Sequence, residues 1–222
     1  YLQWANSVWL QNSADMGRIN TGLTRDVDQM LSYRDDRYFD FVNVREFQFP
    51  LGHVYNHDPI FGVTGSNLNT KSLTDEEFRT YLYMMATRGN AFWELYYSNE
   101  LLTEGDKWLV NARALNWLKE KYHILRHAKL IGTTPAKGNV YGYSSWELSE
   151  GIISVRNASA EAKSFEVTLD RIIGLPEGLK GLHRTTVLAA NSDKADDNSA
   201  LFNYGDKITL TLQPGEARIW RF

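Results

Sequence analysis

Apolar residues follow two different patterns along the chain, and the change falls near residue 130. In the first part, short apolar stretches alternate with segments in which apolar residues recur at helical spacing. We predict strands over residues 8–10, 44–51 and 91–97, and helices over residues 24–33, 74–87 and 107–127. Strands that alternate with helices in this order favour a parallel α/β sheet.

The ends and faces of these elements also follow from residue types. Thr74 and Glu77 fit a capping box, and Thr24 is the predicted N-cap of the first helix. The stretch 91–97 is nearly all apolar, as expected for a strand buried on both faces. The third helix carries an apolar stripe of Trp108, Leu115, Leu118, Tyr122 and Leu125.

Beyond a connector near residues 132–138, short apolar runs are separated by polar turns. Strands are predicted over residues 141–146, 151–156, 164–170, 184–190, 207–212 and 217–222. This spacing is typical of a small antiparallel β-sandwich, whose core should include Trp146 and Trp220. We therefore predict an α/β domain over residues 1–132 and a β-sandwich domain over residues 137–222.

The α/β part is too small to be a complete barrel. A (β/α)8 barrel takes about 250 residues and eight units, whereas the pattern here gives three units. Either the three units form a small open sheet, or they are the last part of a barrel whose earlier strands lie elsewhere. The chain begins at Tyr1 and not at Met, so we expect a mature or shortened piece of a longer protein.

Composition narrows the functional class. The 222 residues are 43% hydrophobic and 23% charged, with a net charge of −3, which does not suggest a nucleic-acid-binding protein. The chain has no cysteine, which excludes disulfides, Cys-ligated metals and thiol catalysis. Its 13% aromatic content suits either sugar stacking or core packing. No apolar run approaches the length of a membrane helix, and no cofactor-binding motif appears.

Active-site residues of parallel α/β folds lie in loops after the carboxyl ends of the strands. The first such place holds Asn12, Ser13 and Asp15, of which Asp15 is the candidate catalytic carboxylate. The same residues would also serve simply to cap a turn or a helix. Trp9, at the end of this first strand, is a candidate for sugar stacking.

The second place is the loop that holds His53, Tyr55, His57 and Asp58. Histidine and aspartate side chains make directional hydrogen bonds to hydroxyl groups, and Tyr55 offers a stacking face. The loop could instead be stabilised by its own hydrogen bonds. A metal is not expected, because Gly52 and Pro59 argue against a helix that would align the two histidines.

The third place is the pair Trp93 and Glu94. A carboxylate inside an apolar strand is costly unless it is paired or functional. Glu94 either pairs with Arg88, which would be structural, or lines a substrate pocket beside Trp93.

Several short motifs resemble the C-terminal part of a known clan of enzymes. These lie at residues 8–15 (similar to a late-barrel Trp-x-Ser-Asp strand, with the Asp displaced), 49–54, 78–95, 151–157, 169–170 and 212–218. The clan is that of the retaining α-galactosidases and related glycoside hydrolases (clan D), and the endo-α-N-acetylgalactosaminidases are a related match. The resemblance implies the last strand–helix units of a (β/α)8 barrel followed by a small antiparallel β-sandwich.

The resemblance also implies a function. Clan members hydrolyse α-linked galactosides or N-acetylgalactosaminides with two aspartates, one the nucleophile and one the acid/base. The nucleophile would then lie outside this chain, and Asp15 is the only aspartate here that ends an early strand. The implied sugar contacts are Trp9, His53, His57, Asp58, Trp93 and Glu94.

The remaining expectations concern partners and location. We expect a carbohydrate substrate, no cofactor, no nucleic acid and no membrane span, and we expect the missing N-terminal barrel portion as a partner. The resemblance implies a secreted or periplasmic bacterial enzyme. The alternative function is that of a non-catalytic carbohydrate-binding protein. The aromatic content and the predicted β-sandwich favour this alternative.

Overall fold

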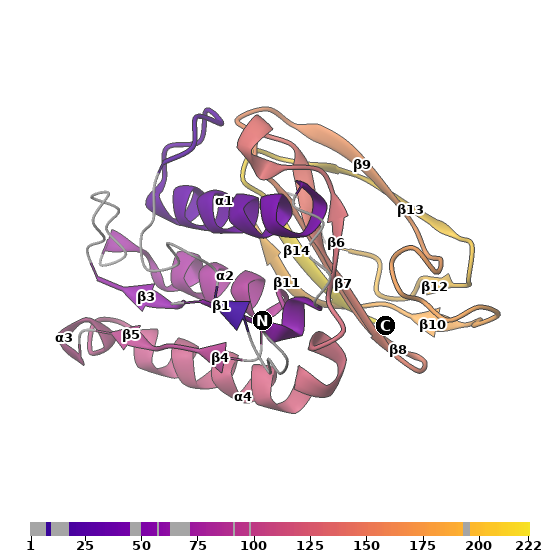
Figure 1. Ribbon diagram of the computed structural model, residues 1–222, viewed down its shortest axis with the longest axis horizontal. Helices are drawn as coiled ribbons and strands as arrows, with labels where there is room; N and C mark the ends of the chain where they lie inside the picture. The colour runs from indigo at the N-terminus through magenta and orange to yellow at the C-terminus, as the bar shows by residue number, and fades with distance from the viewer. Residues whose placement is uncertain are drawn as a thin grey trace, which may run out of the picture.

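The computed structural model describes residues 8–9, 18–44, 50–56, 58–62, 72–90, 92–97, 99–192 and 196–222. It is a mixed α/β structure in which helices gather on one side and antiparallel strands on the other (Figure 1). The helical segments are α1 (Asp26–Phe39), the π-helix η1 (Asp40–Val44), the 3-10 helix η2 (Leu51–His53), α2 (Asp75–Ala86), α3 (Asn99–Leu102), α4 (Lys107–Leu125) and the 3-10 helix η4 (Pro135–Lys137).

Short parallel strands precede the helices, which confirms the predicted parallel sheet. They are β1 (Val8–Trp9), β2 (Val54–Asn56), β3 (Ile60–Phe61), β4 (Phe92–Trp93) and β5 (Tyr96–Tyr97). One sheet has the order β1-β2-β4, and β3 pairs with β5 just beyond it. Within the described residues, β1 and β4 each pair along one edge only.

The second half of the chain forms antiparallel sheets. Its strands are β6 (Lys129–Gly132), β7 (Val140–Glu147), β8 (Glu150–Asn157), β9 (Lys163–Thr168), β10 (Leu182–His183), β11 (Thr185–Ala190), β12 (Leu201–Phe202), β13 (Lys207–Leu212) and β14 (Ala217–Arg221). The main sheet has the order β11-β14-β8-β7-β6, while β13 pairs with β9 and β10 with β12. All six strands predicted in this half are confirmed, and β6, β10 and β12 are additional.

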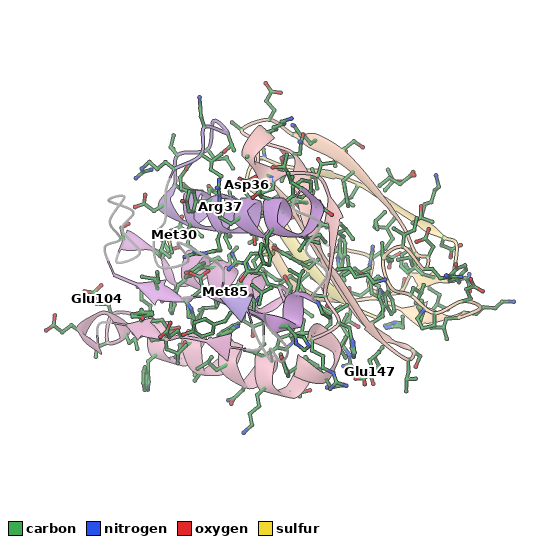
Figure 2. All side chains as sticks on the ribbon, in the orientation of Figure 1. Met30, Asp36, Arg37, Met85, Glu104 and Glu147 are labelled. Atoms are coloured by element: carbon green, nitrogen blue, oxygen red, sulfur yellow. The ribbon has the colours of Figure 1, made fainter. Side chains whose placement is uncertain are left out.

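The main antiparallel sheet is covered on both faces. Side chains of a strand alternate between the two faces, so neighbours enter different cores. Ile152 and Ile219 pack with α1, α2 and α4, whereas Ile153 and Trp220 pack with β9 and β13. Trp146 and Trp220 are buried, as predicted. The helices and the main sheet therefore share one continuous core, which also contains Met30 and Met85, labelled in Figure 2.

The two predicted helix starts had different outcomes. Thr74 and Glu77 form the predicted capping box, with the Glu77 amide donating to Thr74 Oγ1 at 3.2 Å. The first helix is longer than predicted, and its N-cap is Arg25, so Thr24 does not cap it. The helix continues past residue 33 because Arg34, Asp35 and Tyr38 find buried polar partners, which residue patterns do not show.

Two predicted strands differ from the structure. The segment 44–51 begins in η1 and ends in η2, residues 45–49 lie outside the described residues, and the strand is instead β2. The segment predicted as one strand over residues 91–97 contains two short strands, β4 and β5. Leu95, which lies between them, and Tyr96, the first residue of β5, are exposed. The apolar run is therefore not a single strand buried on both faces.

Helix α4 is confirmed, but its predicted apolar stripe does not enter the core as a whole. Leu125 is buried, Leu118 is half-buried, and Trp108 is 66% exposed. Across the described part of the chain, no helix combines the length and apolar character needed to cross a membrane.

Candidate functional site

Two strands of the parallel sheet carry polar side chains beyond their carboxyl ends. Tyr55 on β2 is opposite Phe92 on β4, and the two strands run parallel. The chain then continues through Asp58 and Glu94, and the amide of Glu94 donates to the carbonyl of Asp58 at 3.1 Å. The amide of Tyr96 donates in the same way to the carbonyl of Pro59 at 3.1 Å. Backbone bonds thus fix the two loops side by side.

Glu94 forms a cluster with Tyr55 and Tyr96, which we call the Glu94 cluster. Both phenols hydrogen-bond to the Glu94 carboxylate. The bond to Glu94 is the main cause that raises the pKa of Tyr55 to about 12, and partial burial and Glu94 together raise the pKa of Tyr96. Tyr96 remains 47% exposed, so the Tyr96 side of the cluster opens to solvent, whereas Glu94 Oε2 is buried. A carboxylate has about four lone-pair sites, so such a cluster can also accept hydrogen bonds from ligand hydroxyls.

Trp93 lies on the other side of the strand from this cluster. It packs against the helical core and lines a groove of about 300 Å³. The other residues of the groove are Asn90, Leu115, Leu118, Lys119 and Tyr122. The structure therefore directs the Trp93 indole toward α4, and does not bring it together with Glu94.

Asp58 is the centre of a buried charge network. Its carboxylate is 1% exposed and accepts from Arg34 Nε at 3.0 Å and from Arg88 Nη1 at 2.8 Å. Tyr81 donates to its second oxygen at 3.2 Å. Because protein side chains surround it, the geometry differs from the direct sugar contact predicted from the sequence.

The network continues into the antiparallel sheet through Asp35. Arg88 Nε donates to Asp35 at 2.7 Å, and the hydroxyls of Tyr141 and Tyr143 on β7 each donate to Asp35 at 2.6 Å. Burial alone would lower the pKa of Arg88, but the charges of Asp35 and Asp58 outweigh it and hold that pKa well above its usual value. The predicted structural pairing of Arg88 with Glu94 is therefore replaced by pairing with the two aspartates.

The other predicted site residues are placed as follows. Asn12, Ser13, Asp15 and His57 lie outside the described residues, so their predicted roles remain predictions. Trp9 is placed by its backbone alone, opposite Tyr55 in the parallel register. His53 is exposed at the end of η2. Among the residues that the structure describes, no group of three or more potential metal ligands occurs.

Residue patterns missed part of this arrangement. The apolar run predicts that Tyr96 lies in a buried strand, whereas it is 47% exposed, and residue patterns do not identify Arg34 on α1 as a partner of Asp58. The available indication was the run Arg34-Asp35-Asp36-Arg37, since so many charges in a helix with apolar neighbours require buried partners or solvent.

No protein-family model and no curated protein sequence matches the chain. Among solved structures, the chain is similar to a GH27 β-L-arabinopyranosidase from Geobacillus stearothermophilus, at 12% identity and a TM-score of 0.53 over 89% of this chain and 42% of that one. A variant of that enzyme in complex with arabinose gives 15% identity and the same TM-score of 0.53, over 89% of this chain and 43% of that one.

A third structure, BH1870 from Bacillus halodurans C-125, is provisionally named an α-N-acetylgalactosaminidase. It shows 11% identity and a TM-score of 0.50 over 93% of this chain and 48% of that one. The chain therefore spans less than half the length of each of these neighbours. At these identities the likeness shows the fold alone. At the level of the fold, this likeness to parts of larger glycosidase structures agrees with the predicted resemblance.

Proposed function

We propose that this chain is the C-terminal portion of a retaining glycoside hydrolase that acts on α-linked galactosides or N-acetylgalactosaminides. The observation that carries the proposal is the Glu94 cluster, which opens to solvent at the carboxyl ends of parallel strands in a fold shared with glycosidases. Sugar-binding loops of (β/α)8 enzymes lie at this end of the strands. Glu94, Tyr55 and Tyr96 would contact sugar hydroxyls.

The strand order supports the view that the parallel sheet is the end of a (β/α)8 barrel. β1, β2 and β4 are parallel neighbours, and α1, α2 and α4 follow them in turn. In a closed barrel every strand pairs along both edges, whereas the described β1 and β4 each pair along one. The antiparallel strands would then be the β-sandwich that follows the barrel.

The outer side of α4 supports the same arrangement. Trp108 is 66% exposed, and Leu115, Leu118 and Tyr122 line the groove beside β4. Apolar residues left accessible along one helix in this way are typical of a contact with further protein. The preceding strand–helix units of the barrel would cover it.

The catalytic pair follows from the same proposal. Retaining hydrolysis uses two carboxyl groups about 5 Å apart, one as the nucleophile and one as the acid/base. Asp15, at the end of the first strand, would be the acid/base, and the nucleophile would come from the part of the enzyme outside this chain. Asp15 lies outside the described residues, so this role rests on the resemblance.

The test uses the complete polypeptide that contains this sequence. Kinetics with p-nitrophenyl α-galactoside and its N-acetylgalactosaminide analogue should show activity. Glu94→Gln should lower kcat/KM about 10- to 100-fold, because a hydrogen bond to a charged group is worth about 1.5–3 kcal/mol. The matched control is Glu104→Gln, an exposed glutamate between α3 and α4 (Figure 2), which should leave kcat/KM unchanged.

The outcome separates hydrolysis from binding alone. If the complete polypeptide binds these sugars without hydrolysing them, the carbohydrate-binding alternative replaces the enzyme. If Glu94→Gln and Glu104→Gln have equal activity, the Glu94 cluster is not the sugar site.

Location forms the last part of the proposal. A secreted or periplasmic enzyme would meet polymeric galactosides before their uptake, and this expectation rests on the family resemblance. Fractionation of the source cells, with an antibody against this chain, should recover it outside the cytoplasm.

A further inference from the structure

The parallel strands that carry the Glu94 cluster are too short to fix it by themselves. β2 has three residues and β4 and β5 have two each, so few ladder hydrogen bonds hold them. The residues that connect them are held differently. The carbonyls of Asp58 and Pro59 accept from the amides of Glu94 and Tyr96, at 3.1 Å each. The position of Asp58 therefore sets the position of the cluster's carboxylate.

Asp58 is in turn fixed from three directions. Arg34 on α1 and Arg88 at the end of α2 donate to one carboxylate oxygen, and Tyr81 on α2 donates to the other. The side chains of both arginines are fully buried, so solvent does not weaken these pairs. Arg88 also reaches Asp35, which receives the hydroxyls of Tyr141 and Tyr143 from β7. An unbroken chain of charged hydrogen bonds thus runs from the main antiparallel sheet to the backbone of the Glu94 cluster.

We propose that Asp58 is a positioning residue through which the antiparallel sheet, by way of Tyr143, Asp35 and Arg88, sets the geometry of the Glu94 cluster. The proposal deepens the proposed function, on which it rests for the meaning of the cluster as a sugar site. It differs from a purely structural role, in which loss of Asp58 would lower stability and leave the Tyr55–Glu94 contact intact.

The test measures that contact directly and needs no sugar, so its failure is distinct from failure of the proposed function. The full chain is labelled with ¹³Cζ-tyrosine, and the Tyr55 resonance is assigned with Tyr55→Phe. At pH 10, a tyrosine with a pKa of about 12 is about 1% ionised, and one with the ordinary pKa of about 10 is about 50% ionised. The charged and titratable groups that act on Tyr55 are Glu94 and Tyr96.

Asp58→Asn is the main variant, and Glu216→Gln is its matched control. Glu216 is also a buried carboxylate paired with a buried arginine, Arg218, but this pair lies in the antiparallel half of the chain, away from the contacts of Asp35 and Asp58. We expect the ionised fraction of Tyr55 at pH 10 to rise from about 1% toward 50% in Asp58→Asn and to stay near 1% in Glu216→Gln. A folded Asp58→Asn protein with Tyr55 still un-ionised would overturn the proposal, as would an equal rise in both variants.

If Asp58→Asn fails to fold, a second variant tests the coupling between the antiparallel sheet and Tyr55. Tyr143→Phe removes one hydroxyl from Asp35 at the far end of the chain of contacts and keeps the ring. We expect a several-fold rise in the ionised fraction of Tyr55 at pH 10, while Tyr204→Phe, in the other core of the antiparallel region, should cause none. An unchanged Tyr55 resonance in Tyr143→Phe would contradict the coupling.

Discussion

The ion pair between Arg156 on β8 and Asp28 on α1 joins the two halves of the chain, and its removal should be costly. Arg156 Nη2 donates to Asp28 Oδ1 at 2.8 Å, and the two side chains are 0% and 2% exposed. Nη1 of Arg156 donates to Ser32 Oγ at 2.9 Å and to Tyr141 Oη at 3.2 Å. Asp28 has a second cation, Arg25, whose Nε donates to it at 2.7 Å.

These contacts predict an asymmetry between the two single variants. Loss of one partner from a buried pair costs about 3–5 kcal/mol, because the other charge stays buried without compensation. In Asp28→Asn the guanidinium of Arg156 keeps only neutral partners, so we expect the free energy of unfolding to fall by the full cost of about 3–5 kcal/mol. Arg156→Met should cost less, about 2–3 kcal/mol, because Asp28 keeps the half-exposed Arg25.

The double variant completes the cycle. With both charges removed, no uncompensated buried charge remains, so its cost should fall below the sum of the two single variants by about 1–3 kcal/mol. The free energies of unfolding come from urea titrations followed by tryptophan fluorescence. Glu177→Gln is the control, because its pair with Arg171 is solvent-exposed and its loss should change stability by less than about 0.5 kcal/mol.

Two results would refute this reasoning. If Asp28→Asn unfolds within about 1 kcal/mol of the wild type, the charge is not buried as the structure shows. If the double variant equals the sum of the single ones, the two side chains do not interact.

Three further predictions concern stability. Thr74→Ala should lower the unfolding free energy by about 1 kcal/mol in urea titrations, because the capping box of α2 is lost, and Thr74→Ser should retain it. Gly142→Ala should abolish cooperative thermal unfolding, because its Cβ would overlap the carbonyl oxygen of Ser154 on β8. Burial holds the pKa values of Tyr81 and Tyr143 well above normal, so the unfolded chain loses these protons near pH 10 and the folded chain keeps them. Stability should therefore fall as the pH rises above about 10, by up to about 1.4 kcal/mol per pH unit for each such tyrosine, and urea titrations of Tyr143→Phe should show the smaller slope.

Local patterns predicted those elements whose ends are determined locally. The capping box of α2 depends on residues three positions apart, and both of its hydrogen bonds form as expected. The strands β8 and β14 are eight and five residues long and nearly all buried, so their apolar runs identified them. The extent of α1 was underestimated, because its last two turns depend on buried partners far away in the sequence.

The sequence predicts that parallel strands occur, but it does not predict at which residues they lie. A two- or three-residue strand contains too few residues for a period of two to be recognised. The strand predicted over residues 44–51 lies several residues before β2, and its two described ends belong to η1 and η2. Similarly, the sequence predicts that Leu95 and Tyr96 are buried, because one is apolar and the other aromatic. In the structure both lie at an exposed strand end.

The candidate site shows the same limit. Glu94 could be nominated from the sequence, because a carboxylate within an apolar run is unusual. Its partners could not, since Tyr55 lies about forty residues away and either pairing, with Arg88 or with a ligand, was compatible with the sequence. Asp58 was nominated for its chemistry, but hydrogen bonds across 24, 30 and 23 positions, to Arg34, Arg88 and Tyr81, determine what it does.

Because the contacts of Asp58 and Asp35 come from residues far away in the sequence, the geometry of the Glu94 cluster depends on the antiparallel half of the chain. Strands of two or three residues contribute few backbone hydrogen bonds, and a sheet of such strands is marginal by itself. The eight-residue strands β7 and β8, paired along their whole length, form a far more rigid frame. Tyr141 and Tyr143 project from that frame onto Asp35, and the buried arginines carry the constraint to Asp58. Burial strengthens each of these charged contacts, so together they constrain the short parallel strands more than the few backbone hydrogen bonds between those strands do.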